Sequence, residues 1–163
     1  ADLLTRGYTN VAVNNFAVNA PVANQPVYVR VANPSGAKVI GGIEAARDIG
    51  VTAAAMVGTG NATAGTLSAS DITPAGVYTV KMTAATAFNV LDSGGAIVGS
   101  GVTGTQLTML NGLSLKVTVG GTPAVAGDTI AVTVVDNTVV IPGNTYFTGA
   151  TDSAGNAEIA YNI

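Results

Sequence analysis

Residues 106–134 read QLTMLNGLSLKVTVGGTPAVAGDTIAVTV, and this stretch decides the fold class. Apolar side chains occupy every second position in two of its runs, residues 113–119 and 130–134. A period of two residues is typical of a β-strand with one buried and one solvated face, and the branched Val, Ile and Thr side chains favour the same structure. Asn111-Gly112 separates residues 106–110 from the run at residues 113–119, and Asn-Gly between two strand-like runs is the strongest short signal for a β-hairpin. The stretch therefore predicts consecutive antiparallel strands joined by tight turns.

The same two-residue period continues along most of the chain, at Val27–Val31, Tyr78–Met82 and Ile159–Ile163. Turn-forming residues separate the runs, at Asn33–Gly36, Asp92–Gly95 and Asp152–Asn156. About ten short strands at regular spacing indicate a sandwich or a barrel. Residues 42–51, which include Glu44 and Asp48, favour one or two helical turns. The predicted fold class is all-β, with sandwich or barrel-like units, short hairpins, an extended N-terminal arm and at most one short helix.

Changes in composition divide the chain. Residues 1–20 are predicted to form an extended N-terminal arm, and residues 21–57 a small β unit that residues 136–163, a C-terminal β segment, could complete. Residues 58–70 are rich in Gly, Thr, Ala and Ser, which predicts a flexible connection. Residues 71–135 are predicted to form a self-contained β-sandwich module.

The composition argues against several functional classes. Only 9% of the 163 residues are charged, the net charge is −3, and the six basic residues are scattered. A nucleic-acid binder needs a basic stripe, so we expect no nucleic-acid partner. The long uncharged stretches contain too much Gly, Thr and Asn for a transmembrane helix, so we expect no membrane partner. The first ten residues lack the pattern of a secretory signal, and Ala1 fits removal of an initiator Met or cleavage of a leader.

The inventory of reactive side chains is small. The chain has no His and no Cys, which removes the commonest general base, the thiolate nucleophile and the commonest transition-metal ligands. Glu44 and Asp48 would share a helix face as a carboxylate pair, but we expect both to be solvated. Asp92, Asp128 and Asp152 are predicted to be turn residues rather than metal ligands. We therefore predict a protein that is not an enzyme, with no catalytic residue, no metal ligand and no cofactor.

The N-terminal arm is the candidate binding segment. It carries apolar side chains among polar residues that would not fold alone, and such a segment gains order by lying on a partner. A terminus that is disordered or that packs on its own chain is the alternative. On the partner-binding interpretation, deletion of residues 1–18 is expected to leave a folded protein that binds its partner more weakly. The candidate partner-binding residues are Leu3, Leu4, Arg6, Tyr8, Val11, Val13, Phe16 and Val18.

Four motifs occur in one order along residues 60–130: GNATAGTL at 60–67, AGVYTV at 75–80, FNVLDSGG at 88–95 and AGDTI at 126–130. This order resembles the β-rich module of tailed-bacteriophage head decoration, or capsid cement, proteins. Residues 20–45 look like the small β unit that precedes that module. The chain departs from the pattern at Gly94, where the family often has Pro or Asp, and after Thr138, where no counterpart can be placed.

The resemblance implies a protein made in the host cytoplasm and located on the outer capsid surface of the virion. There it would bind the icosahedral head and stabilise contacts between subunits of the major capsid protein. It also implies self-association, with a homotrimer favoured over a dimer. The alternative function is an Ig-like adhesion or carbohydrate-binding module of a phage fibre or a bacterial surface protein. Such a module usually presents exposed aromatic residues, and this chain has eight aromatics and no Trp.

Overall fold

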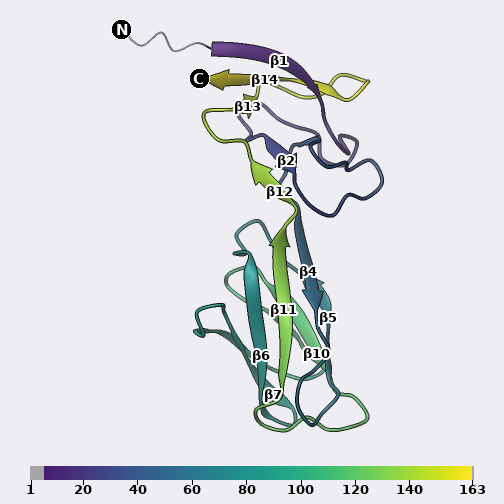
Figure 1. Cartoon of the computed structure of the whole chain (residues 1–163), viewed down its shortest axis with the longest axis vertical. Helices are drawn as coiled ribbons and strands as arrows, with labels where there is room; N and C mark the ends of the chain where they lie inside the picture. Colours follow the sequence, from purple (N-terminus) through teal and green to yellow (C-terminus); the bar gives the residue numbers. More distant parts are fainter. Residues whose placement is uncertain (1–5, 163) are drawn as a thin grey trace. The chain divides into compact units, whose positions relative to one another are not determined.

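The computed structural model describes residues 6–162, with the backbone alone described for Arg6 and Asn162. These residues form fourteen β-strands and no helix, which confirms the predicted all-β class (Figure 1). The strands belong to four antiparallel sheets, none of which closes into a barrel. The chain divides into two compact units, and unit 2 spans Ile49–Val135. Unit 1 consists of the residues up to Asp48 and from Asp136 onward, so unit 2 is an insertion within unit 1.

Unit 2 consists of a five-stranded and a three-stranded sheet. The larger sheet has the order β4-β11-β6-β7-β8, and the smaller one has the order β5-β10-β9. The strands of the larger sheet are β4 Ile49–Ala53, β6 Gly76–Ala84, β7 Ala87–Leu91, β8 Ile97–Val102 and β11 Thr129–Asp136. Those of the smaller sheet are β5 Thr63–Ser68, β9 Gln106–Thr108 and β10 Ser114–Thr118.

The core of unit 2 follows the two-residue period of its sequence. Alternate residues of β6, β7, β10 and β11 are buried, and they form one cluster with residues that follow β9. The hairpins predicted at Asp92–Gly95 and Asn111-Gly112 are confirmed, because β7 pairs with β8 and β9 with β10 in antiparallel register. The buried side chains include Tyr78, Val80, Met82, Phe88, Val90, Leu113, Leu115, Val117, Ile130, Val132 and Val134.

Residues 58–70, expected to be a flexible connection, are part of unit 2. Residues 63–68 form β5, which pairs with β10. The loop before β5 is held by Asp128, whose carboxylate accepts hydrogen bonds from the backbone N–H groups of Thr59 (2.9 Å) and Gly60 (2.8 Å). A sequence rich in Gly and Thr is therefore ordered here by a carboxylate that lies about seventy residues later in the chain.

Unit 1 consists of two three-stranded sheets. The first has the order β1-β14-β13, with β1 Arg6–Ala12, β13 Tyr146–Phe147 and β14 Asn156–Asn162. The second has the order β12-β2-β3, with β2 Tyr28–Arg30, β3 Ile43–Glu44 and β12 Thr138–Val140. The core of unit 1 contains Val13, Val27, Ala45, Phe147, Ala157 and Ile159. Residues after Asp136 supply β12, β13 and β14, so both sheets combine the two ends of the sequence.

The helical turns expected at residues 42–51 are wrong. Ile43–Glu44 form β3 and Ile49 begins β4. Glu44 lies opposite Tyr28 in the β2–β3 pairing, and its carboxylate binds Arg30. This tertiary ion pair outweighs the helix propensity of so short a segment. No helix that could cross a membrane is present in the described part of the chain.

Candidate functional site

The outer strand of unit 1, β1, presents an open pairing edge among the described residues. β1 is antiparallel to β14 through seven residue pairs without a register shift, from Arg6↔Asn162 to Ala12↔Asn156. Its other side has no partner strand among residues 6–162 (Figure 1). Of the edge strands in this described part, β1 is the longest, and β5 and β8 have register shifts in their pairings.

The predicted partner-binding residues do not form one surface. Tyr8 and Val18 are 57% and 74% exposed. Val11 and Phe16 are half-buried against the core of unit 1, and Val13 is 5% exposed within it. Arg6 belongs to β1, and Leu3 and Leu4 lie outside the described residues.

This packing affects the expected deletion of residues 1–18. Removing them would take away β1 and the buried Val13, and would leave the edge of β14 that pairs with β1 without its partner. The sequence-based expectation that the protein stays folded after this deletion conflicts with that packing. Substitution of exposed residues on β1 is the sharper test of binding.

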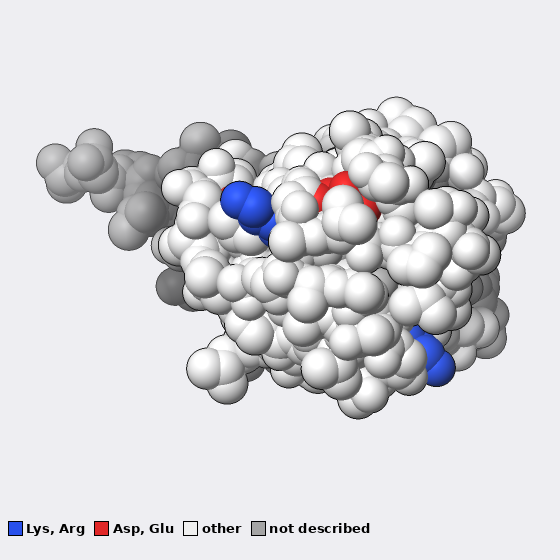
Figure 2. Space-filling model, turned by 90° about the horizontal axis from the view of Figure 1, so that it is seen from below, with Lys and Arg blue, Asp and Glu red and all other residues white. Residues whose placement is uncertain are grey.

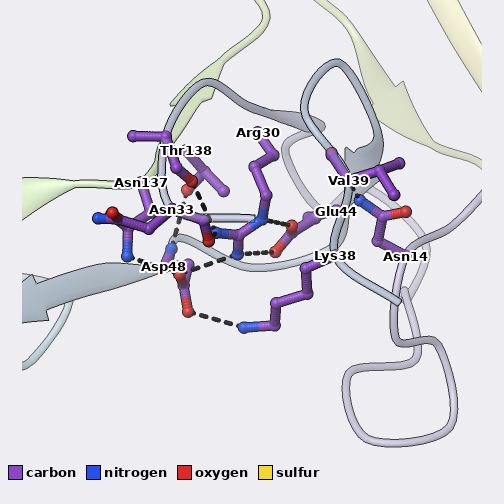
Figure 3. A network of polar contacts seen from close by, with 10 residues as sticks. Asn14, Arg30, Asn33, Lys38, Val39, Glu44, Asp48, Asn137 and Thr138 are labelled. Atoms are coloured by element: carbon purple, nitrogen blue, oxygen red, sulfur yellow. Dashed lines mark hydrogen bonds and ion pairs between the residues drawn. The ribbon is translucent and has the colours of Figure 1, made fainter. Parts of the chain in front are cut away.

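The second feature of unit 1 is a buried ion network centred on Arg30, which is 1% exposed (Figure 3). Its Nε donates to Glu44 Oε1, and its Nη2 donates to Glu44 Oε2 (3.1 Å) and Asp48 Oδ2 (2.8 Å). Its Nη1 donates to the backbone carbonyls of Ala32 and Asn33, each at 3.0 Å. All five N–H groups of the guanidinium are thereby used, and the bond to Glu44 is the main cause that raises the pKa of Arg30.

Asp48 links this network to the two chain segments that lead into and out of unit 2. Its Oδ1 accepts from Lys38 Nζ (2.8 Å), and its Oδ2 also accepts from the Asn137 amide (2.9 Å). Its backbone N–H donates to Thr138 Oγ1 (2.8 Å), and its carbonyl accepts from the N–H of Asn137 (2.8 Å). The residues just before and just after unit 2 are therefore tied together within unit 1.

The expectation that Glu44 and Asp48 are both solvated is wrong for Glu44, which is 3% exposed, and Asp48 is half-buried. The physical reason is Arg30, a cation that needs carboxylate partners once it is buried. A hollow of about 500 Å³ lies beside the network, but the charged groups that line it are already paired with one another. The network holds unit 1 together, and neither of its carboxylates, Glu44 and Asp48, is left unpaired for proton transfer.

The network predicts a loss of stability in acid. Burial alone would raise the pKa of Asp48, but hydrogen bonds from Lys38, Asn137 and Arg30 outweigh burial and lower it to about 2 from 3.8. Since the folded-state pKa is depressed, the stabilisation is complete above pH about 4 and is lost as the pH falls toward 2. The contribution is at most about 2 kcal/mol. Unfolding of unit 1 measured between pH 5 and 2 is expected to show this loss in the wild type and a smaller one in Asp48→Asn, and equal pH slopes would contradict it.

The turn carboxylates behave largely as predicted. Asp92 Oδ1 accepts from the N–H groups of Gly94 and Ala96, and Asp152 Oδ1 accepts from those of Ala154 and Asn156, each at 2.9 Å. Asp128 accepts from Val125 in its own turn (3.0 Å) but also reaches the distant loop before β5. These backbone hydrogen bonds lower the pKa of Asp128, and the bond from Val125 has the largest effect. No cluster of three or more acidic side chains able to hold a metal ion occurs among residues 6–162.

The exterior of both units is poor in charge and rich in exposed apolar side chains. Figure 2 shows one face on which isolated charged groups interrupt an otherwise uncharged surface. The most exposed large apolar residues are Tyr8, Val18, Val22, Val39, Ile40, Val57, Ile72, Ile97, Val102 and Leu110.

No protein-family model matches the chain, and no curated protein matches it in sequence. Two crystal structures of FlgL from Xanthomonas campestris are similar in part. The first shares 26% identity and a TM-score of 0.43 over 57% of this chain and 30% of that chain. The second shares 20% identity and a TM-score of 0.40 over 77% of this chain and 34% of that chain. This chain thus spans about a third of the length of the FlgL chains that it matches.

Proposed function

We propose that this chain is a decoration protein that binds the outer surface of a phage head and stabilises contacts between major capsid protein subunits. The observation that carries the proposal is the free edge of β1, together with the motif resemblance along residues 60–130. A free edge of this kind recruits a strand from another chain, because its unpaired N–H and C=O groups are a template for pairing.

The side chains of β1 support the proposal. Residues 7–12 contain no charge and no proline, the two features by which natural proteins most often block edge pairing. Tyr8 is 57% exposed, and Thr9 and Asn10 are also exposed. Tyr is one of the residue types that are enriched at protein–protein interfaces.

The uncharged exterior supports an assembly role as well. Apolar side chains exposed on both units lose less hydration energy than charged ones when they are buried between subunits. A decoration protein works by binding energy alone, and an oligomer that touches several capsid subunits multiplies weak contacts through effective concentration. We propose a homotrimer for this reason and keep a dimer as the alternative.

A lysine placed on the free edge tests the role of β1. Thr9→Lys is expected to leave the protein folded, since residue 9 is exposed, and to weaken binding to expanded, undecorated heads at least tenfold. The measurement is co-sedimentation with heads, followed by mass spectrometry of the copy number per capsid protein.

Thr63→Lys is the matched control, because Thr63 is also an exposed Thr on an edge strand, β5 of unit 2. It is expected to bind heads like the wild type. If the wild type fails to co-sediment with heads, the decoration function is wrong. If Thr9→Lys binds as well as Thr63→Lys, the function stands and β1 is not the binding edge.

A further inference from the structure

A hollow of about 420 Å³ lies in unit 1 beside β13, and none of the candidate residues of the binding edge lines it. Its walls come from residues 24–26 and from residues 140–146, and none of its lining residues is charged. This volume is within the range of about 300–1,000 Å³ that is typical of small-molecule sites. The lining residues are Asn24, Pro26, Val140, Ile141, Gly143, Asn144, Thr145 and Tyr146.

The polar groups around this hollow are available to a ligand. Within the described part of the chain, the carboxamides of Asn24 and Asn144 and the hydroxyl of Tyr146 have no hydrogen-bond partner in the protein. Each carboxamide offers two donors and an acceptor, and the phenol offers one of each. Pro26, Val140 and Ile141 add an apolar surface to the same hollow.

Two further hollows in the described part of unit 1 are lined by charged residues. The one of about 500 Å³ contains Arg30, Lys38 and Asp48, which bind one another. The one of about 390 Å³ contains Arg47 and Asp136, which also form an ion pair. The hollow beside β13 differs from these two in having no charged lining residue and two Asn carboxamides beside its aromatic ring.

The backbone that carries these groups is held in place. The N–H of Asn24 donates to the carbonyl of Phe147 (2.8 Å), and the N–H of Phe147 donates to the carbonyl of Gln25 (3.0 Å). On the other side, the N–H of Ile141 donates to the carbonyl of Val27 (2.8 Å). Segment 24–27 is thus hydrogen-bonded to two other segments of the chain, so a ligand would meet a wall that is already ordered.

We propose that this hollow binds a neutral glycan. A pyranose ring has a face of C–H groups, which packs on an aromatic or apolar surface, and a rim of hydroxyls, which both donate and accept hydrogen bonds. Tyr146 and Pro26 offer the first kind of contact, and the two Asn carboxamides offer the second. Because the lining residues carry no charge, the site offers no counter-ion to a sialic acid or a uronic acid. This proposal goes beyond capsid binding and does not rest on it.

A glycan array that contains neutral, sialylated and uronate-bearing oligosaccharides tests the proposal with the full chain. We expect binding to neutral hexose or N-acetylhexosamine glycans, followed by saturation-transfer contacts from the ring protons of the methyl glycosides of the bound sugars. Asn144→Ala is expected to weaken this binding about tenfold, because an unpaired sugar hydroxyl is left behind. Tyr146→Phe, which keeps the ring, is expected to weaken it a few-fold.

Ser153→Ala is the control, since Ser153 is also an exposed polar residue of unit 1 but lies neither in the lining of the hollow nor on β1. It is expected to bind glycans like the wild type. No binding to any neutral glycan, or a preference for acidic glycans, would overturn the proposal. If the wild type and the combined Asn144→Ala and Tyr146→Phe variant bind glycans with equal affinity, the glycan does not bind in the hollow beside β13. Head binding by the same variants is a separate readout that reports on the decoration function.

Discussion

Replacement of Glu44 by Gln is expected to lower the free energy of unfolding of unit 1 by about 3 kcal/mol, because it leaves the buried Arg30 with only the half-buried Asp48 to compensate its charge. Arg30 is 1% and Glu44 3% exposed, so water cannot take the place of the lost carboxylate. Hydrogen–deuterium exchange under increasing denaturant separates the two units. Peptides from β14 should lose protection early, and peptides from β10 should not change.

Two further variants give this prediction its controls. Asp136→Asn breaks the pair that Arg47 Nε forms with Asp136 Oδ1 (2.8 Å), whose carboxylate is 36% exposed, and should cost less than about 1 kcal/mol. Arg30→Met combined with Glu44→Leu removes both charges and should restore most of the loss, as apolar replacement of buried pairs often does. Wild-type stability in Glu44→Gln would show that the network does not hold unit 1 together.

The sequence predicts unit 2 well, because there the period of two residues and the fold agree. Val80, Val90, Val117 and Val132 each belong to an alternating or turn-bounded apolar run, and each is fully buried. The hairpin turns carry their own local chemistry, since Asp92 bonds backbone groups within four residues of itself. Local patterns suffice wherever the stabilising contacts are local or follow one face of a sheet.

The sequence predicts unit 1 poorly, because its decisive contacts join distant residues. In the run Val27–Val31 the alternation places Arg30 on the wet face, yet Arg30 is buried and Val31 is 48% exposed. The partners of Arg30 lie 14 and 18 residues away, and nothing in the local pattern identifies them. The sequence offers one signal for this ion network, which is the scarcity of charge. Because only 9% of the residues are charged, each charged side chain is a candidate member of an ion pair. The free edge of β1 was hidden for the same reason, because its partner β14 is at the other end of the chain.

Replacement of Phe88 by Ala is expected to destabilise unit 2 by about 3 to 5 kcal/mol and to leave unit 1 unchanged. Phe88 is 1% exposed, and it lies opposite Gly101 in the β7–β8 pairing. A Cβ atom on Gly101 would lie 2.7 Å from the ring carbon Cζ of Phe88, so the glycine leaves the space that the ring fills. Gly101→Val is therefore expected to cost about 1 to 3 kcal/mol by overpacking.

Phe88→Ala and Gly101→Val should compensate each other, because the valine would occupy part of the cavity that Phe88→Ala creates. The double variant is expected to be more stable than the sum of the single effects by at least about 1 kcal/mol. Gly99→Val is the matched control, since a Cβ there would meet the Met109 side chain at 2.6 Å and not Phe88, so its coupling to Phe88→Ala should be smaller. Denaturant unfolding of all five variants gives the coupling energies, and additive losses for Phe88 and Gly101 would show that the ring does not depend on the glycine. A loss confined to β10 peptides here and to β14 peptides in Glu44→Gln would establish that the inserted unit and its host unit are stabilised separately.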